Sequence, residues 1–212
     1  MDKRNLRAVR AGYDKISEEY ARRSFQATPD ERVDHLILDL LLTHVEGVVC
    51  DLGCGPGHNA RYMRDRGAQV VGVDLSAGML EQARRRNPDI DFLEANMYRL
   101  PVEAGTWGAV VALYSIIHIP RAEVVRVLRE IWRVLQPGGL LLLAFYIGEA
   151  TICTKRWWDV PVSVKYTHFR AVEMEKYLTL AGFHVEGNLA LAGTQGQADC
   201  RYVFARKPWT AA

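Results

Sequence analysis

Apolar positions along this chain follow two alternating patterns, helical spacing and short continuous runs. Near the start, apolar and aromatic side chains recur at helical spacing and predict a helix over residues 1–24. These positions are Leu6, Val9, Tyr13, Ile16 and Tyr20. A leucine-rich helix is expected over 31–43, and the apolar run over 47–52 predicts a buried parallel strand.

The alternation continues to the end of the chain. Further helices are predicted over 58–66, 76–86, 123–135 and 171–181. Further strands are predicted over 69–74, 90–94, 107–113, 140–145, 183–188 and 202–206. Strands that alternate with helices indicate an α/β fold with a mainly parallel sheet covered on both faces.

Residues 146–170 break this rhythm. The stretch is rich in aromatic side chains, namely Trp157, Trp158, Tyr166, His168 and Phe169. A long insertion in a compact domain is usually functional, often a lid or a pocket wall. We therefore expect it to form part of a substrate pocket; a packed surface loop is the alternative.

Length and charge narrow the classes of protein. A chain of 212 residues suits a single α/β domain over 1–212, and a net charge of +2 gives no argument for a nucleic-acid partner. The charged start does not resemble a signal peptide, and the longest apolar run is too short to span a bilayer. We expect a cytoplasmic protein, either a monomer or a homodimer, with no membrane span.

The first predicted strand leads into a glycine-rich loop, Asp51-Leu52-Gly53-Cys54-Gly55-Pro56-Gly57. In open α/β sheets, ligands bind beyond the carboxyl ends of the strands, where glycines let the backbone approach closely. The spacing is G-x-G-x-G, whereas the dinucleotide fingerprint is G-x-G-x-x-G and would place its third glycine at His58.

Two carboxylates refine the prediction of the ligand. Asp51 precedes the loop, where a carboxylate suits a cation such as an ammonium group better than a pyrophosphate. Asp74 ends the second strand and can accept hydrogen bonds from both hydroxyls of a ribose. S-adenosylmethionine carries an ammonium group, a sulfonium group and a ribose.

Three stretches resemble class I S-adenosylmethionine-dependent methyltransferases, most closely their small-molecule branch with its quinone-biosynthesis relatives. They are VVCDLGCGPGHNARYMRDRGAQVVGVDLSAGMLEQAR, FLEANMYRLPVEAGTWGAVVALYSIIHIPR and VLREIWRVLQPGGLLLLAF, which cover roughly residues 45–146. The resemblance implies a Rossmann-like, seven-stranded, mainly parallel sheet with helices on both faces and an antiparallel last strand. It also implies S-adenosylmethionine as cofactor, with S-adenosylhomocysteine as product.

The resemblance further implies which residues contact the cofactor. They are Gly53, Cys54, Gly55 and Gly57 in the loop, Leu75 and Met79 around the adenosine, Asn96 and Met97 at the adenine, and Tyr114 and Ser115 beside the methionine moiety. Asn96 stands where the family usually has an acidic residue. Residues 1–45 resemble a helical flap, from which Tyr13 or Tyr20 would cover the sulfonium.

The catalytic residues are harder to predict. Methyl transfer from a sulfonium depends mainly on positioning, and a base is needed only where the acceptor loses a proton. His118 is our candidate base, with a structural role as the alternative. Trp157, Trp158, Tyr166 and His168 are our candidates for contact with an apolar, aromatic or cationic small-molecule acceptor. His58 could contact the methionine carboxylate or simply begin its helix.

Other functions stay open at this point. No Asp/Glu/His cluster marks a metal site, so no metal is expected. The alternatives to a small-molecule methyltransferase are a catalytically silent cofactor-binding regulatory module, an RNA methyltransferase, and a nicotinamide-dependent oxidoreductase that the glycine spacing opposes.

Overall fold

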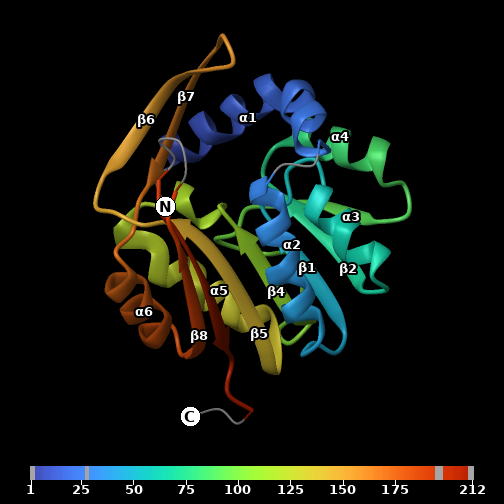
Figure 1. The fold of residues 1–212 in the computed structure, drawn as a ribbon, viewed down its shortest axis with the longest axis vertical. Coiled ribbons are helices and arrows are strands. Elements are labelled where there is room, and N and C mark those ends of the chain that lie inside the picture. The colour runs from blue at the N-terminus through green and yellow to red at the C-terminus, as the bar shows by residue number, and fades with distance from the viewer. Residues whose placement is uncertain (1–2, 27–28, 194–197, 210–212) are drawn as a thin grey trace.

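The computed structural model describes residues 3–26, 29–193 and 198–209, which form one seven-stranded sheet, six α-helices and a separate two-stranded hairpin (Figure 1). The strands of the main sheet are β1 Val48–Leu52, β2 Gln69–Asp74, β3 Asp91–Glu94, β4 Trp107–Leu113, β5 Leu135–Tyr146, β8 His184–Leu191 and β9 Cys200–Arg206. The predicted α/β fold and seven-stranded sheet are confirmed.

The order of the strands is β3-β2-β1-β4-β5-β9-β8. Neighbouring strands from β3 to β5 pair in parallel, whereas β9 runs antiparallel to both β5 and β8. The antiparallel last strand is therefore also confirmed. The order reverses between β1 and β4, which creates the crevice where open α/β sheets bind ligands.

Helices cover both faces of the sheet (Figure 1). They are α1 Lys3–Ser24, α2 Pro29–Leu42, α3 His58–Asp65, α4 Ala77–Arg86, α5 Val124–Val134 and α6 Ala171–Leu180, with 3-10 turns at Ile116–His118 and Arg121–Glu123. Leu143 packs with α5 and α6 on one face, and its neighbour Leu142 packs with α2 on the other. Because side chains alternate along a strand, the continuous apolar run of β5 fills both cores.

The aromatic insertion forms an antiparallel hairpin of β6 Thr151–Trp157 and β7 Val160–Thr167. Trp158 and Asp159 form its turn with positive φ angles of 45° and 66°, as a tight type I′ connection requires. The sequence interpretation recognised the insertion but not its strands. The signal was the alternation in β7, where Val162 and Val164 are buried and Ser163 between them is exposed.

The hairpin packs on α1, above the sheet in Figure 1. Val162 and Val164 lie against Val9 and Ile16 of α1. A Cβ on Gly12 of α1 would come within 2.4 Å of the Val164 side chain, so a glycine is required for this close approach. The helix and the hairpin therefore form one layer.

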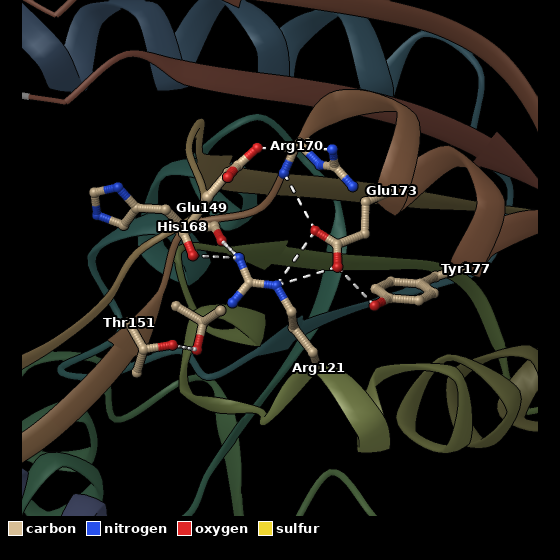
Figure 2. A network of polar contacts seen from close by, with 8 residues as sticks. Arg121, Glu149, Thr151, His168, Arg170, Glu173 and Tyr177 are labelled. Carbon is tan, nitrogen blue, oxygen red and sulfur yellow. Dashed lines mark hydrogen bonds and ion pairs between the residues drawn. The ribbon is translucent and has the colours of Figure 1, made fainter.

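Arg121 fixes the base of the hairpin to the domain (Figure 2). Its guanidinium donates to the backbone carbonyls of Glu149, before β6, and of His168, after β7. It also pairs with the Glu173 carboxylate of α6 at 3.1 Å, and the Tyr177 hydroxyl donates to that same carboxylate. One side chain thus joins both legs of the hairpin to α6.

In the described part of the chain, no helix combines the length and the apolar composition that a membrane span needs. The His, Cys, Asp and Glu residues of that same part form no group of three or more that could hold a metal ion.

Candidate functional site

A cavity of about 270 Å³ lies at the carboxyl ends of β1, β2 and β4, beneath α1. Fourteen of the residues predicted to form the site line it: Tyr13, Tyr20, Asp51, Gly53, Cys54, Gly55, Asp74, Leu75, Met79, Asn96, Met97, Tyr114, Ser115 and His118. The other five are not among the lining residues: Gly57, Trp157, Trp158, Tyr166 and His168.

The glycine loop forms one wall of the cavity, and its glycines differ in what they allow. All three have positive φ angles, 80° at Gly53, 53° at Gly55 and 80° at Gly57. A Cβ on Gly53 would collide with Ser115 at 2.3 Å. A Cβ on Gly55 would meet only the ring of Tyr20, at 3.9 Å. Gly53 is therefore needed for packing, whereas Gly55 leaves space for a ligand.

Asp51 is the most unusual side chain of the site. It is 2% exposed, and its Oδ2 atom has no hydrogen-bond partner among the described residues. Burial, with the nearby charge of Asp74, raises its pKa from 3.8 to about 7. A buried carboxylate oxygen without a partner is costly, and a cationic group in the cavity would offset that cost. The residue thus fits an ammonium ligand.

Asp74 is held in place by the backbone. Its two carboxylate oxygens accept from the amides of Gly55 and Ser76, each at 2.8 Å. Burial raises its pKa, although these hydrogen bonds oppose the effect. The Leu75 amide also bonds to this carboxylate, which has about four lone-pair sites, so a site remains for a ligand hydroxyl and the side chain fits the predicted contact with ribose.

The wall beyond β3 would face the base of a nucleoside. Asn96 and Met97 line this end of the cavity together with Leu75 and Met79. The Asn96 side-chain oxygen accepts from the backbone amide of Tyr98 at 3.1 Å, which fixes its orientation. The mostly apolar surroundings suit a flat aromatic ring.

Cys54 lies at the bottom of the loop. Burial raises the pKa of its thiol well above the ordinary value, which opposes a nucleophilic role. It is buried beside Gly72 of β2, consistent with a small packing residue.

The helix α1 forms the roof of the cavity. Tyr13 and Tyr20 line it from above, with their ring centroids 6.1 Å apart. Asp14, which the sequence interpretation missed, accepts hydrogen bonds from the Ser76 hydroxyl at 2.6 Å and the Gly78 amide at 3.0 Å. Asp14 therefore anchors the roof to the start of α4. Residues 1–2 and 27–28 of the predicted flap lie outside the described residues.

His118 connects three elements above the cavity. Its Nδ1 atom lies 3.0 Å from the Lys165 carbonyl of β7, and its Nε2 lies 2.9 Å from the Tyr13 hydroxyl of α1. A carbonyl only accepts, so Nδ1 donates and the neutral ring accepts at Nε2 from Tyr13. Burial lowers the pKa of His118, which favours that neutral form.

A second hydrogen-bond chain borders the cavity near α2. Tyr114, with a positive φ of 52°, places its hydroxyl 2.9 Å from that of Tyr202. The Tyr202 hydroxyl donates to Asp34 at 2.6 Å, and Asp34 and Tyr114 both line the cavity. Asp34 and Tyr202 were missed because nothing in the sequence relates a residue of α2 to one of β9.

The aromatic residues of the hairpin form a layer behind the lining. Trp157 packs edge-on against Tyr13 at 5.6 Å, and Trp158 packs against Tyr20 at 5.9 Å. Tyr166 and His168 pack against Tyr146 of β5 at 6.3 and 5.5 Å. Trp157 and Trp158 thus support the two tyrosines that face the cavity from α1.

Comparisons with known proteins agree with this geometry. Residues 49–139 match the family model described as a methyltransferase domain. The chain is 31% identical over 138 residues to a malonyl-[acyl-carrier protein] O-methyltransferase of Salmonella typhimurium, covering 65% of this chain and 53% of that protein. Over this stretch the chain is similar to S-adenosylmethionine-dependent methyltransferases. The resemblance seen in the sequence is thereby confirmed.

Two further relatives extend the comparison. A demethylmenaquinone methyltransferase of Paenarthrobacter aurescens is 33% identical over 109 residues, which cover 52% of this chain and 42% of that protein. The chain thus spans about half the length of these curated relatives. The structure of a Burkholderia thailandensis 1,6-didemethyltoxoflavin-N1-methyltransferase with bound S-adenosylhomocysteine has a TM-score of 0.73 at 19% identity, covering 94% of this chain and 87% of that one. That likeness concerns the fold.

Proposed function

We propose that the protein transfers the methyl group of S-adenosylmethionine to a small-molecule acceptor. The observation that carries the proposal is Asp51, a buried carboxylate with an unpartnered oxygen in a cavity at the crevice of the sheet. Asp74, at the end of the next strand, provides a second carboxylate for the ribose. Together they match a ligand that carries a positive charge and a vicinal diol.

The protein's own residues bind and orient the donor. Asp51 would pair with the ammonium group, Asp74 with the ribose hydroxyls, and Asn96 and Met97 with the adenine. When bound, S-adenosylmethionine supplies an electrophilic methyl group attached to sulfur. The rings of Tyr13 and Tyr20 cover the cavity from α1 and would exclude water from the sulfonium.

Several features support a small acceptor. The lining includes the carboxylates of Asp34, Asp51 and Asp74, and among the described residues neither lysine nor arginine lines the cavity. A polyanion such as RNA would be repelled by such a lining. Of the named relatives, the demethylmenaquinone methyltransferase favours the small-molecule branch that includes the quinone-biosynthesis enzymes.

The hairpin would complete the acceptor pocket from the side of β7. Trp157, Trp158, Tyr166 and His168 would act by positioning Tyr13, Tyr20 and Tyr146. For an acceptor that loses a proton, His118 would be the base. That proton would pass to the Tyr13 oxygen while Tyr13 gives its own proton to Nε2 of His118, because these two atoms are hydrogen-bonded.

Transfer of a labelled methyl group tests the proposal. The protein is incubated with methyl-labelled S-adenosylmethionine and a cell extract separated into a small-molecule filtrate and a macromolecular retentate. We expect label in compounds of the filtrate, and none with Asp51→Asn at a donor concentration near the wild-type KM. Label confined to RNA or protein in the retentate would contradict a small acceptor. Absence of label from both fractions would favour a silent binding module.

A further inference from the structure

A hydrogen-bond chain of Tyr114, Tyr202 and Asp34 lies at one end of the cavity, which its first and last members line. Tyr202 belongs to β9 and pairs with Ala144 of β5, whereas Asp74 ends β2. Strands β1, β4 and β5 lie between β2 and β9, so the chain is separated by three strands from the carboxylate that we assign to the ribose. This end of the cavity is therefore the one that the acceptor would occupy.

The backbone of Tyr114 has a conformation that a bulky residue rarely adopts. Its φ angle of 52° lies in the left-handed region, directly after the last residue of β4. Its amide donates to the Ala144 carbonyl at 2.9 Å, and its ring packs against that of Tyr146 at 5.2 Å, so the surrounding structure holds it there. Strained residues cluster at active sites and ligand clamps. The conformation is thus typical of a residue placed for a ligand.

The hydrogen-bond chain has a fixed direction. The Tyr202 hydroxyl donates its proton to Asp34 at 2.6 Å, so its oxygen accepts from the Tyr114 hydroxyl at 2.9 Å. Burial, with the charge of Asp34, raises the pKa of both tyrosine hydroxyls, so both keep their protons and Asp34 carries the negative charge. Toward a ligand, the Tyr114 oxygen and the Asp34 carboxylate can then only accept hydrogen bonds.

The charges of the lining are unsuited to an acidic acceptor. Besides Asp34, the lining holds the carboxylates of Asp51 and Asp74, and neither lysine nor arginine of the described chain belongs to it. The imidazoles in the lining are neutral at pH 7, because burial lowers the pKa of His58 to about 4 and also lowers that of His118. The donor's ammonium and sulfonium exceed its carboxylate by a single positive charge. Binding of the donor therefore leaves the site negative.

We propose that the acceptor is a small molecule with a net positive charge, and that Asp34 and the Tyr114 hydroxyl bind its ammonium group. The inference rests on the proposed function and names the class of acceptor for that same site. An ammonium group offers several N–H donors to a wall that only accepts, and its charge balances that of Asp34. An acidic acceptor would instead meet like charge on this wall.

Acceptors separated by charge test the proposal. A small-molecule filtrate of a cell extract is divided by ion exchange at pH 7 into cationic, anionic and neutral fractions. Each fraction is then incubated with the protein and methyl-labelled S-adenosylmethionine. We expect most of the transferred label in compounds of the cationic fraction, and most of it in either other fraction would overturn the proposal. No transfer in any fraction would instead contradict the proposed function.

Variants of α2 relate this preference to Asp34. Asp34→Asn keeps the size of the side chain and removes its charge, so the apparent KM for the cationic fraction should rise about ten- to a hundredfold. Its affinity for S-adenosylhomocysteine, measured by calorimetry, should stay close to that of the wild type, which also shows that the variant is folded. Asp39→Asn, on the same helix but outside the cavity, is the matched control and should leave both values unchanged.

Tyr202→Phe provides a second, independent variant. It removes the hydroxyl that joins Asp34 to Tyr114, and the same apparent KM should rise about three- to tenfold with the affinity for S-adenosylhomocysteine unchanged. The proposal is overturned if Asp34→Asn keeps the wild-type KM, or if it weakens S-adenosylhomocysteine as much as the cationic acceptor. If Asp34→Asn does not fold, Tyr202→Phe decides, and a wild-type KM in that variant would overturn the proposal.

Discussion

At the residue scale, Asp51 combines a cost in stability with the binding role that we propose for it. It is buried, its Oδ2 atom has no partner among the described residues, and the charge of Asp74 lies nearby. A residue placed only for stability would be paired or uncharged. Sites of this kind are typical of binding centres, where stability is lost in favour of function.

The pKa of Asp51 leads to a prediction on stability. Folding raises the pKa of Asp51 from 3.8 to about 7. Between these two pH values the folded state keeps the carboxyl proton, whereas the unfolded state has lost it. The stabilisation from the protonated group is complete below pH 3.8 and is lost as the pH rises to about 7. At pH 8, Asp51→Asn should therefore raise the free energy of unfolding of the ligand-free protein by about 1–3 kcal/mol.

Denaturant unfolding at pH 5 and pH 8 measures this effect. The gain from Asp51→Asn should be larger at pH 8 than at pH 5. Asp159→Asn, at the exposed turn of the hairpin, is the matched control and should show no such difference. A lower stability of Asp51→Asn at pH 8 would mean that the carboxylate is satisfied in the ligand-free protein.

A few of the residues that line the cavity could be predicted from local patterns, and the resemblance to a known family implied most of the others. Asp51, the glycines and Asp74 lie at the ends of strands in the sequence, and the carboxyl ends of parallel strands meet at one edge. Asp14 and Asp34 could not be predicted, because their roles depend on how α1 and α2 dock. Trp157 and Trp158 were expected in the pocket, but composition does not tell a lining residue from one that supports the lining.

At the element scale, the hairpin and α1 form one roof over the cofactor cavity. Val162 and Val164 pack against α1, the Lys165 carbonyl orients His118, and His118 in turn contacts Tyr13. The hairpin therefore affects the cavity through the roof helix. Its strands were not predicted from the sequence, although β7 alternates between buried and exposed residues with the period of a strand.

Arg121 allows a test of this arrangement. Arg121→Ala removes hydrogen bonds to both legs of the hairpin and the ion pair with Glu173. Because the guanidinium bonds are charge-assisted and partly shielded, we expect a loss of about 1–3 kcal/mol in the free energy of unfolding. Amide exchange across residues 151–167 should become faster.

Hydrogen-exchange mass spectrometry measures that change segment by segment. Arg85→Ala, at an exposed position on α4, is the control and should leave the exchange of the hairpin unaltered. Unchanged exchange in Arg121→Ala would mean that packing on α1 holds the hairpin without the arginine.

At the scale of the whole molecule, the sheet brings the charged groups of the site together. The order β3-β2-β1-β4-β5 puts Asp74 and Asp51 on adjacent strands. The sequence predicted this sheet well, because buried strands and glycine-ended helices have strong local signals. The third carboxylate of the lining, Asp34, comes from α2, and the local signals in the sequence did not predict it.

Such a lining favours a donor with a positive charge over a dinucleotide. NAD would bring a pyrophosphate to the glycine loop, where Asp51 and Asp74 would repel it. S-adenosylhomocysteine would instead place an ammonium group near Asp51 and a ribose near Asp74.

Calorimetric titration of the wild-type protein with S-adenosylhomocysteine and, separately, with NAD tests the central claim most directly. We predict saturable one-to-one binding of S-adenosylhomocysteine with a dissociation constant in the micromolar range, and no measurable heat with NAD. Micromolar binding of NAD without binding of S-adenosylhomocysteine would contradict the account.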